Sequence, residues 1–229
     1  MALYAIGDLH LSLGADNPMD VFGGPWENYV EKIRLGFSAL HDDDVCVLCG
    51  DLAWGMTMEQ ALPDFQFIEA LPGKKILLKG NHDFWWSTAK KAYDFFEAHN
   101  MHTMDILNNN CYFYGDYAIC GTRGWFYEEA KGEAHDRKIM LREVGRLEAS
   151  LKAAGDKTKL VFLHYPPKYL GYECPEILAL LDDYHVPLCC YGHIHSRGCR
   201  SAFQGMYHDT EFRLLSADYI SFCPRRILP

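Results

Sequence analysis

The sequence has 229 residues, of which 49% are hydrophobic, and its formal net charge is −9 at pH 7. This length and hydrophobic content suffice for one domain, residues 1–229, with a well-buried core. The negative charge argues against nonspecific binding to nucleic acid or to an anionic membrane as the main activity. Because the N-terminus lacks a basic, signal-like region and no run of about 18 apolar residues follows, we expect a cytoplasmic protein.

Apolar runs typical of strands alternate along the chain with segments of helical periodicity. The strands are expected at residues 2–6, 45–49, 75–78, 159–163 and 187–191. The helices are expected at residues 26–40, 57–71, 87–99 and 127–153, with Gly155 as the end of the last one. This alternation predicts an α/β fold with parallel strands and crossover helices.

Two predicted hairpins add a second kind of structure to this pattern. Residues 111–114 and 117–120 flank a Gly115-Asp116 turn, and residues 198–207 and 211–216 form another pair of strands. The predicted fold class is therefore mixed α/β, with hairpins that could form a second sheet packed on the first. The irregular stretch Ser12–Pro25 is either a loop over the functional site or a plain surface loop.

The cysteines indicate a reducing compartment. There are nine of them, an odd number, so they cannot all pair within one chain. Cys46 and Cys49 form a C-x-x-C pair, but they lie in the apolar run Val45–Cys49, which is typical of a buried strand. Because residues three apart on a strand point to opposite faces, we interpret this pair as small core residues and not as a redox or zinc site.

Five short polar segments follow predicted strands and carry the donor groups of a metal site. They are Gly7-Asp8-Leu9-His10, Gly50-Asp51-Leu52, Gly80-Asn81-His82-Asp83, Leu163-His164-Tyr165 and Gly192-His193-Ile194-His195. Open α/β sheets collect ligands at the carboxyl ends of their strands, and the glycines would relax the backbone there. The donor set suits two divalent metals that share a bridging carboxylate.

The local spacing supports convergence of these side chains. On an extended backbone residues i and i+2 face the same way. We therefore expect Asp8 to converge with His10, and His193 with His195. Motifs for other mechanisms are missing: the sequence has no phosphate-binding G-x-x-x-x-G-K-[ST], no G-x-G-x-x-G and no G-x-S-x-G.

The motif order Asp-x-His, Gly-Asp, Gly-Asn-His-Asp, His and Gly-His-x-His, over residues 8–195, resembles that of the calcineurin-like metallophosphoesterase superfamily. The resemblance implies a four-layer α/β/β/α sandwich of two mixed sheets flanked by helices. It also implies the allocation of the metal ligands, in which Asp51 bridges two metals. The first metal would be held by Asp8, His10 and His195, and the second by Asn81, His164 and His193.

The resemblance further implies a dinuclear metal-dependent phosphoesterase, in which a hydroxide shared by the metals attacks phosphorus in line. His82 would approach the ester oxygen, either as a general acid or as a stabiliser of phosphoryl charge, with Asp83 as its support. Oxygen and imidazole ligands without a thiolate suit manganese, iron, zinc, cobalt or nickel better than calcium.

The chain lacks motifs of some subgroups of the superfamily, and this narrows the range of expected substrates. Protein serine/threonine phosphatases of the superfamily carry Gly-Asp-x-x-Asp-Arg-Gly and Gly-Asn-His-Glu, which this chain lacks. The chain resembles small bacterial phosphohydrolases of unknown substrate, so the expected partner is a small phosphoester. Phosphodiesterase and phosphomonoesterase activity stay equally open, with a nuclease behind them. The alternative that is not an enzyme is a metal-free binding scaffold with the same fold.

Weaker candidates for substrate contacts are aromatic and basic. Trp54 and the Trp85-Trp86 pair follow ligand segments directly, so they either wall a substrate cleft or pack in the core. Trp125 is open to the same alternatives. Arg123 either reaches a phosphate, since a guanidinium matches its oxygens, or forms a surface salt bridge.

Overall fold

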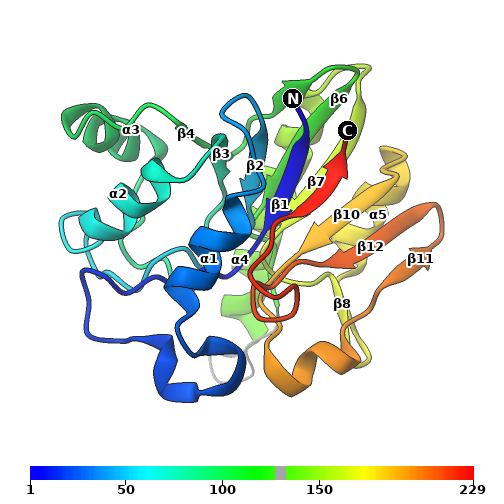
Figure 1. Ribbon diagram of the computed structural model, residues 1–229. Helices are drawn as coiled ribbons and strands as arrows, with labels where there is room; N and C mark the ends of the chain where they lie inside the picture. Colours follow the sequence, from blue (N-terminus) through cyan, green and yellow to red (C-terminus); the bar gives the residue numbers. More distant parts are fainter. Residues whose placement is uncertain (127–132) are drawn as a thin grey trace.

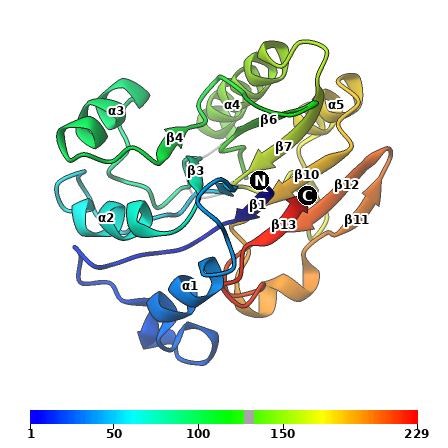
Figure 2. The same ribbon diagram turned by 45° about the horizontal axis from the view of Figure 1, so that its top comes forward.

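The computed structural model describes residues 1–126 and 133–229 and contains two large sheets that pack face to face (Figures 1 and 2). The first sheet has the strand order β13-β1-β2-β3-β4. Strands β1 to β4 run parallel, and β13 pairs antiparallel with β1 at the edge. The bounds are β1 Leu3–Ile6, β2 Val45–Leu48, β3 Lys74–Leu77, β4 Met104–Ile106 and β13 Arg225–Leu228.

The second sheet has the order β11-β12-β10-β7-β6-β5. Its four central strands are parallel, and the antiparallel edge strands β5 and β11 close hairpins with β6 and β12. Its bounds are β5 Tyr112–Tyr114, β6 Tyr117–Thr122, β7 Thr158–Leu163, β10 Leu188–Tyr191, β11 Gly205–Tyr207 and β12 Thr210–Leu214. A small separate hairpin pairs β8 Lys168–Tyr169 with β9 Tyr172–Glu173.

Helices cover the outer face of each sheet. Helices α1 (Tyr29–Phe37), α2 (Leu62–Ala70) and α3 (Ala89–Ala98) contribute to the hydrophobic cluster outside the first sheet. Helices α4 (Glu133–Ala153) and α5 (Pro175–Asp183) do the same for the second sheet, so the layers run α/β/β/α (Figure 1). Within the described ranges, none of these helices combines the length and apolar character needed to cross a membrane.

The inner strands, such as β1, β2 and β10, are largely buried on both faces, as expected for a covered parallel sheet. Leu3 and Ala5 of β1 face the second sheet, whereas Ile6 packs against the outer helices. The two cysteines of the C-x-x-C pair divide in the same way: Cys46 belongs to the outer cluster and Cys49 to the layer between the sheets. This confirms the interpretation of the pair as core residues, and all nine cysteines are free.

The predicted sandwich and its principal strands are confirmed to within a residue or two. Two predicted helices are shorter: α1 begins at Tyr29, not at residue 26, and α2 at Leu62, not at residue 57, because turns precede both. The predicted helix 127–153 is observed as Glu133–Ala153, and residues 127–132 lie outside the described residues. The predicted strand 198–207 is observed only at Gly205–Tyr207, since Ser196–Ser201 forms a 3-10 helix.

A buried lysine ties the end of α2 to the start of β3. The side chain of Lys75 is fully buried, and its Nζ donates hydrogen bonds to the carbonyl oxygens of Glu69 (3.3 Å), Leu71 (2.7 Å) and Gly73 (2.8 Å). The last carbonyls of a helix have no partner within the helix, so the ammonium group satisfies acceptors that would otherwise be buried without a donor.

We expect Lys75→Met to lower the free energy of unfolding by about 2 kcal/mol or more, because it leaves these carbonyl groups without a donor. The neighbouring exposed lysine supplies the control, and Lys74→Met should change stability by less than about 0.5 kcal/mol. Denaturant unfolding of both variants measures the difference. Equal stability of the two variants would contradict this role for Lys75.

Candidate metal centre

The polar segments that follow β1, β2, β3, β7 and β10 meet where the two sheets come together. An isolated parallel bridge pairs Gly7, after β1, with Ser216, after β12. The backbone N–H of Gly7 donates to the carbonyl of Leu215 (2.8 Å), and that of Gly192 donates to the carbonyl of His164 (3.1 Å). The first bond brings a loop of the first sheet beside a loop of the second, and the second bond joins the loops that follow β7 and β10 within the second sheet.

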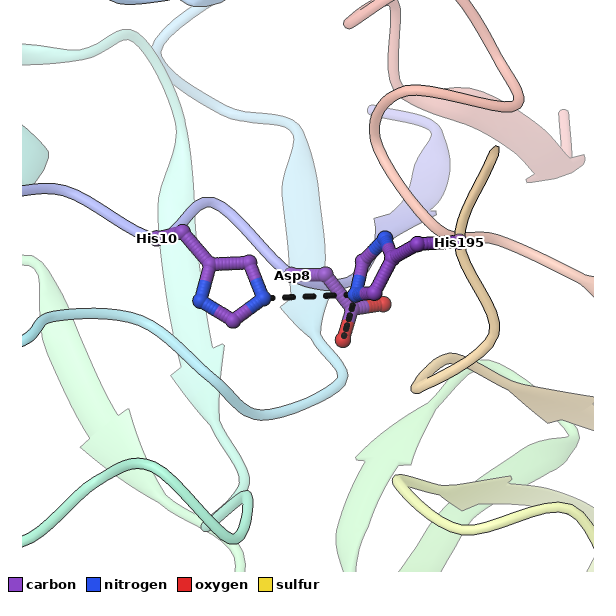
Figure 3. A group of neighbouring side chains, drawn as sticks. All are labelled: Asp8, His10 and His195. Atoms are coloured by element: carbon purple, nitrogen blue, oxygen red, sulfur yellow. Dashed lines mark hydrogen bonds and ion pairs between the residues drawn. The ribbon is translucent and has the colours of Figure 1, made fainter. Parts of the chain in front are cut away.

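The first group of side chains is Asp8, His10 and His195, whose potential ligand atoms all lie within 4.8 Å of one another. Figure 3 shows the three side chains pointing toward one another. The Nε2 atom of His195 lies 3.3 Å from Nε2 of His10 and 3.5 Å from Oδ1 of Asp8. Asp8 and His10 are buried, so the group lies at the bottom of a depression.

The second group is Asp51, His164 and His193, under the same 4.8 Å limit. The amide oxygen of Asn81 lies 2.7 Å from Nε2 of His164, which places Asn81 beside this group. Oδ2 of Asp51 lies 3.5 Å from Nε2 of His164 and 3.7 Å from Nε2 of His10. One carboxylate oxygen of Asp51 therefore contacts a histidine of each group.

The backbone that presents these side chains is not extended, and the argument from i and i+2 spacing is wrong. Asp8 (φ 62°), His10 (φ 47°), Asp51 (φ 51°) and His193 (φ 70°) all adopt left-handed conformations. Such conformations are uncommon outside glycine and store strain at functional sites. Asp8 and His10 still converge, but His193 and His195 fall in different groups.

Gly50 adopts a positive φ of 86°, as expected for a glycine that relaxes the backbone, whereas Gly80 and Gly192 allow close approach of other groups. A Cβ atom on Gly80 would lie 2.1 Å from Oδ1 of Asp51, and one on Gly192 would lie 2.4 Å from Oδ2 of Asp8. Neither glycine has a positive φ. Both motif glycines therefore leave the room that the two carboxylates occupy.

Two of the histidines are oriented by acceptors outside the centre. Nδ1 of His164 lies 3.0 Å from the carbonyl oxygen of Cys49, and Nδ1 of His195 lies 2.9 Å from Oδ1 of Asp218. When each Nδ1 carries the N–H that donates to its acceptor, the Nε2 lone pair faces the interior of the centre. The Nε2 of His164 then faces the oxygen of Asn81, and two lone pairs at that distance suit a cation between them.

Asp218 was not among the residues expected from the sequence. It follows β12 in Leu214-Leu215-Ser216-Ala217-Asp218, so the rule that polar residues after strands gather at one edge could have found it. Its Oδ2 also accepts the backbone N–H of Ser196 (2.8 Å). Asp218 thus fixes both the ring of His195 and the start of the following 3-10 helix.

The electrostatics of the centre favour bound cations. Burial, together with the charges of Asp83 and Asp8, raises the pKa of Asp51 well above its ordinary value. Burial lowers the pKa of His195, but the carboxylates of Asp8 and Asp218 outweigh it and raise the pKa to about 10. Burial lowers the pKa of His164 to about 3, which keeps this imidazole neutral and able to bind a metal. The donor types and this field fit two divalent metals.

Asp83 has backbone partners around Asp51, and its expected support of His82 stays a prediction. Its Oδ2 accepts the backbone N–H groups of Asp51 (2.9 Å) and Gly80 (2.7 Å), and its Oδ1 accepts those of Leu52 (2.8 Å) and Ala53 (3.3 Å). Among the described residues Nδ1 of His82 is buried without a hydrogen-bond partner. Asp83 organises the backbone around Asp51.

His82 and Trp54 lie at the entrance of the centre. Their rings are 4.5 Å apart, and the ring of Trp54 also stacks on His10 at 5.1 Å. The backbone N–H of His82 donates to Oδ1 of Asp51 (2.7 Å), which fixes His82 relative to both groups. A pocket of about 270 Å³ opens here, lined by His10, Met19, Phe22, Asp51, Trp54, His82, His193 and His195.

The other aromatic and basic candidates lie away from this pocket. Trp85 is 3% exposed, packs edge-on against Phe65 and donates its indole N–H to Asp83 (3.0 Å), so it belongs to the core. Trp125 is buried, and Trp86 packs against the same cluster as Trp85. Arg123 pairs with the buried Glu143 (3.4 Å) and does not line the pocket, which favours the salt bridge over a phosphate contact.

Comparisons with known proteins agree with this geometry. Residues 1–197 match the family model of the calcineurin-like phosphoesterases. No curated protein sequence is significantly similar to the chain.

Solved structures share the fold over nearly the whole chain, at identities too low to carry more than the fold. A protein of unknown function from Aquifex aeolicus, AQ665, is 16% identical with a TM-score of 0.53, covering 98% of this chain and 95% of that one. TT1561 of Thermus thermophilus is 15% identical with a TM-score of 0.60, covering 99% and 97%. The phosphopantetheinyl hydrolase PptH from Mycobacterium tuberculosis is 14% identical with a TM-score of 0.57, covering 100% and 96%.

Asp83→Asn tests the backbone role of Asp83. The amide has one acceptor oxygen where the carboxylate has two, so backbone N–H groups beside Asp51 lose their acceptor. We expect the free energy of unfolding to fall by about 2 kcal/mol and the bound metal to decrease. The exposed Asp94→Asn should leave both unchanged. Unchanged stability and metal content in Asp83→Asn would disprove the role.

Asp218→Asn tests the orientation of His195. Loss of the hydrogen-bond partner of a metal-binding histidine lowers metal affinity about 10–100-fold, so the variant should bind its full complement of metal only at higher metal concentration. The matched control is Asp182→Asn, because Asp182 holds the Nδ1 of the exposed His208 (2.7 Å) in the same way. Calorimetric titration with manganese measures both. Equal affinities in the two variants would show that Asp218 does not support the metal.

Proposed function

The chain belongs to the calcineurin-like phosphoesterase family, and we propose that it is a dinuclear metal-dependent phosphoesterase acting on a small phosphoester. The observation that carries the proposal is the position of Asp51, whose Oδ2 contacts a histidine of each ligand group. A carboxylate shared in this way is what two neighbouring metals require. We further propose that residues 1–229 act as one metallophosphoesterase domain.

In this proposal the first metal is held by Asp8, His10 and His195, and the second by Asn81, His164 and His193, with Asp51 between them. Manganese, iron, zinc, cobalt and nickel all suit these donors. When bound, the two cations would activate a water molecule and offset the charge of the phosphoryl oxygens. The nine free cysteines favour a cytoplasmic location, where thiols stay reduced.

The chain's own residues would orient the ester and handle the proton. His82 borders the pocket, so its imidazole can reach the leaving oxygen or a phosphoryl oxygen. Its backbone bond to Asp51 holds the ring at a fixed distance from the ligand groups. The ring of Trp54 covers both His82 and His10 and keeps water from this side of the pocket.

The alternatives have less support. A metal-free scaffold does not account for two groups of ligand atoms, drawn from both sheets, that each lie within 4.8 Å of one another. A nuclease would need cations for the sugar-phosphate backbone, and the described residues lining the pocket include no lysine or arginine. The phosphopantetheinyl hydrolase with this fold adds support for a hydrolase.

Removal of metal tests the proposed function directly. We expect hydrolysis of a nitrophenyl phosphoester to stop after exhaustive chelation and to return with manganese. Asp51→Asn should lower metal content and rate more than His193→Ala, because only Asp51 serves both metals. Full activity in the chelated protein, or two bound metals and a normal rate in Asp51→Asn, would refute the mechanism.

His82→Ala separates proton transfer from metal binding. Metal content should stay nearly intact, because His82 belongs to neither ligand group. General-acid assistance is worth about 10²–10⁴-fold, and a good leaving group needs less of it. The rate should therefore fall strongly on alkyl esters and weakly on nitrophenyl esters. Equal losses on both would assign His82 to stabilisation of phosphoryl charge, and lost metal would make it a ligand.

A further inference from the structure

A second pocket continues the metal pocket on the side of Trp54. It has a volume of about 300 Å³ and is lined by Asp16, Asn17, Pro18, Met19, Val21, Phe22 and Trp54. Met19, Phe22 and Trp54 also line the pocket of the metal centre. A molecule bound at the metals can therefore extend into this second pocket without leaving the surface of the protein.

The walls of the second pocket expose apolar side chains beside the metal centre. Phe22 is 72% exposed and Val21 is 75% exposed, and both lie on the 3-10 helix η1 (Met19–Phe22). Exposed apolar side chains grouped around a pocket mark a binding surface. Trp54 supplies the shared wall, and its ring lies 4.5 Å from that of His82, the residue proposed to face the leaving oxygen.

The turn that carries Phe22 is held in place by the metal centre. Trp26 follows the turn, is buried, and lies edge-on to the rings of His10 (5.8 Å) and His195 (5.7 Å). Oδ1 of Asp20 accepts the backbone N–H of Asn28 (2.7 Å). The loop Ser12–Pro25 is thus anchored over the centre, and of the two alternatives drawn from the sequence the loop over the site is observed.

The charge of the second pocket excludes a further anionic group. Among the described residues that line it, Asp16 is the one charged side chain, and it is negative. The arginines near the centre, Arg197 and Arg200, line a different pocket, which shares no lining residue with the metal pocket. A second phosphate would find no cation beside Trp54, whereas a hydrocarbon group would bury apolar surface there.

We propose that the pocket of Trp54, Phe22 and Val21 receives the alcohol part of the substrate, and that this alcohol is apolar. The substrate class is then a phosphoester whose leaving group is an alkyl chain or an unsubstituted ring, lying over Trp54 on the side of His82. This assignment rests on the proposed phosphoesterase function and adds the chemistry of the leaving group to it.

Two ester series test the proposal: ethyl, butyl and hexyl phosphate, and the matching methyl alkyl phosphodiesters. Their leaving alcohols have nearly equal pKa values. Chain length therefore changes the apolar surface that is buried, and not how strongly the leaving oxygen needs a proton. In the series that the enzyme hydrolyses, kcat/KM should rise about two- to fourfold per methylene, the value of one buried CH₂. A series bearing a terminal carboxylate should lose this gain.

Phe22→Ala tests whether the rise of kcat/KM with chain length arises in this pocket. The ratio of kcat/KM for the hexyl ester to that for the ethyl ester should fall about fivefold, since one apolar wall is removed. Phe113→Ala is the matched control, because Phe113 is 64% exposed on the edge strand β5 and lines neither pocket; its ratio should stay at the wild-type value.

The outcomes separate the two proposals. If neither series nor a nitrophenyl ester is hydrolysed by the metal-loaded protein, the proposed function fails. If esters are hydrolysed with no gain along the chain, or with a preference for the carboxylate series, the apolar leaving group is wrong and the phosphoesterase stands. A gain that survives unchanged in Phe22→Ala overturns the assigned pocket.

Discussion

Three buried carboxyl groups determine how the loops around the candidate metal centre are arranged. Asp8, Asp51 and Asp83 lie buried where the loops of two sheets meet, and within residues 1–126 and 133–229 no lysine or arginine forms an ion pair with them. Asp83 is satisfied by backbone N–H groups. Asp8 and Asp51 accept backbone N–H groups of His193 and His82 and otherwise face imidazoles, and divalent cations in the same space would offset the charge of the two carboxylates.

The local structure follows from the need to bring these groups together. Gly80 and Gly192 leave the volume that the carboxylates of Asp51 and Asp8 occupy, and a methyl group at either position would collide with them. The left-handed backbone of Asp8 and Asp51 turns each side chain inward directly after its strand. The strain of these conformations is offset by the hydrogen bonds that hold the loops, such as those that Asp83 accepts from the backbone N–H groups of Asp51 and Leu52.

The sequence predicted the fold class and the main strands because both depend on local pattern, whereas the grouping of the candidate ligands was implied by the resemblance of the motif order to the superfamily and not by local spacing. Apolar runs mark the strands, and polar residues after strands converge in any such sheet. The sequence did not predict the short strand β4 or the charged edge strand β13, whose pairing is decided by neighbours far along the chain. The backbone partners of Asp83 were missed for the same reason. Asp218 could have been found from its place after the predicted strand 211–216, but its pairing with His195 depends on β12 joining β10.

We propose that one carboxylate, Asp51, joins two metal sites drawn from both sheets. Anomalous X-ray diffraction from crystals of the manganese-loaded protein tests this arrangement. We expect two peaks about 3.5–4 Å apart, one beside Asp8, His10 and His195 and the other beside Asn81, His164 and His193, with Asp51 in contact with both. A single peak, or two peaks of which only one contacts Asp51, would contradict it.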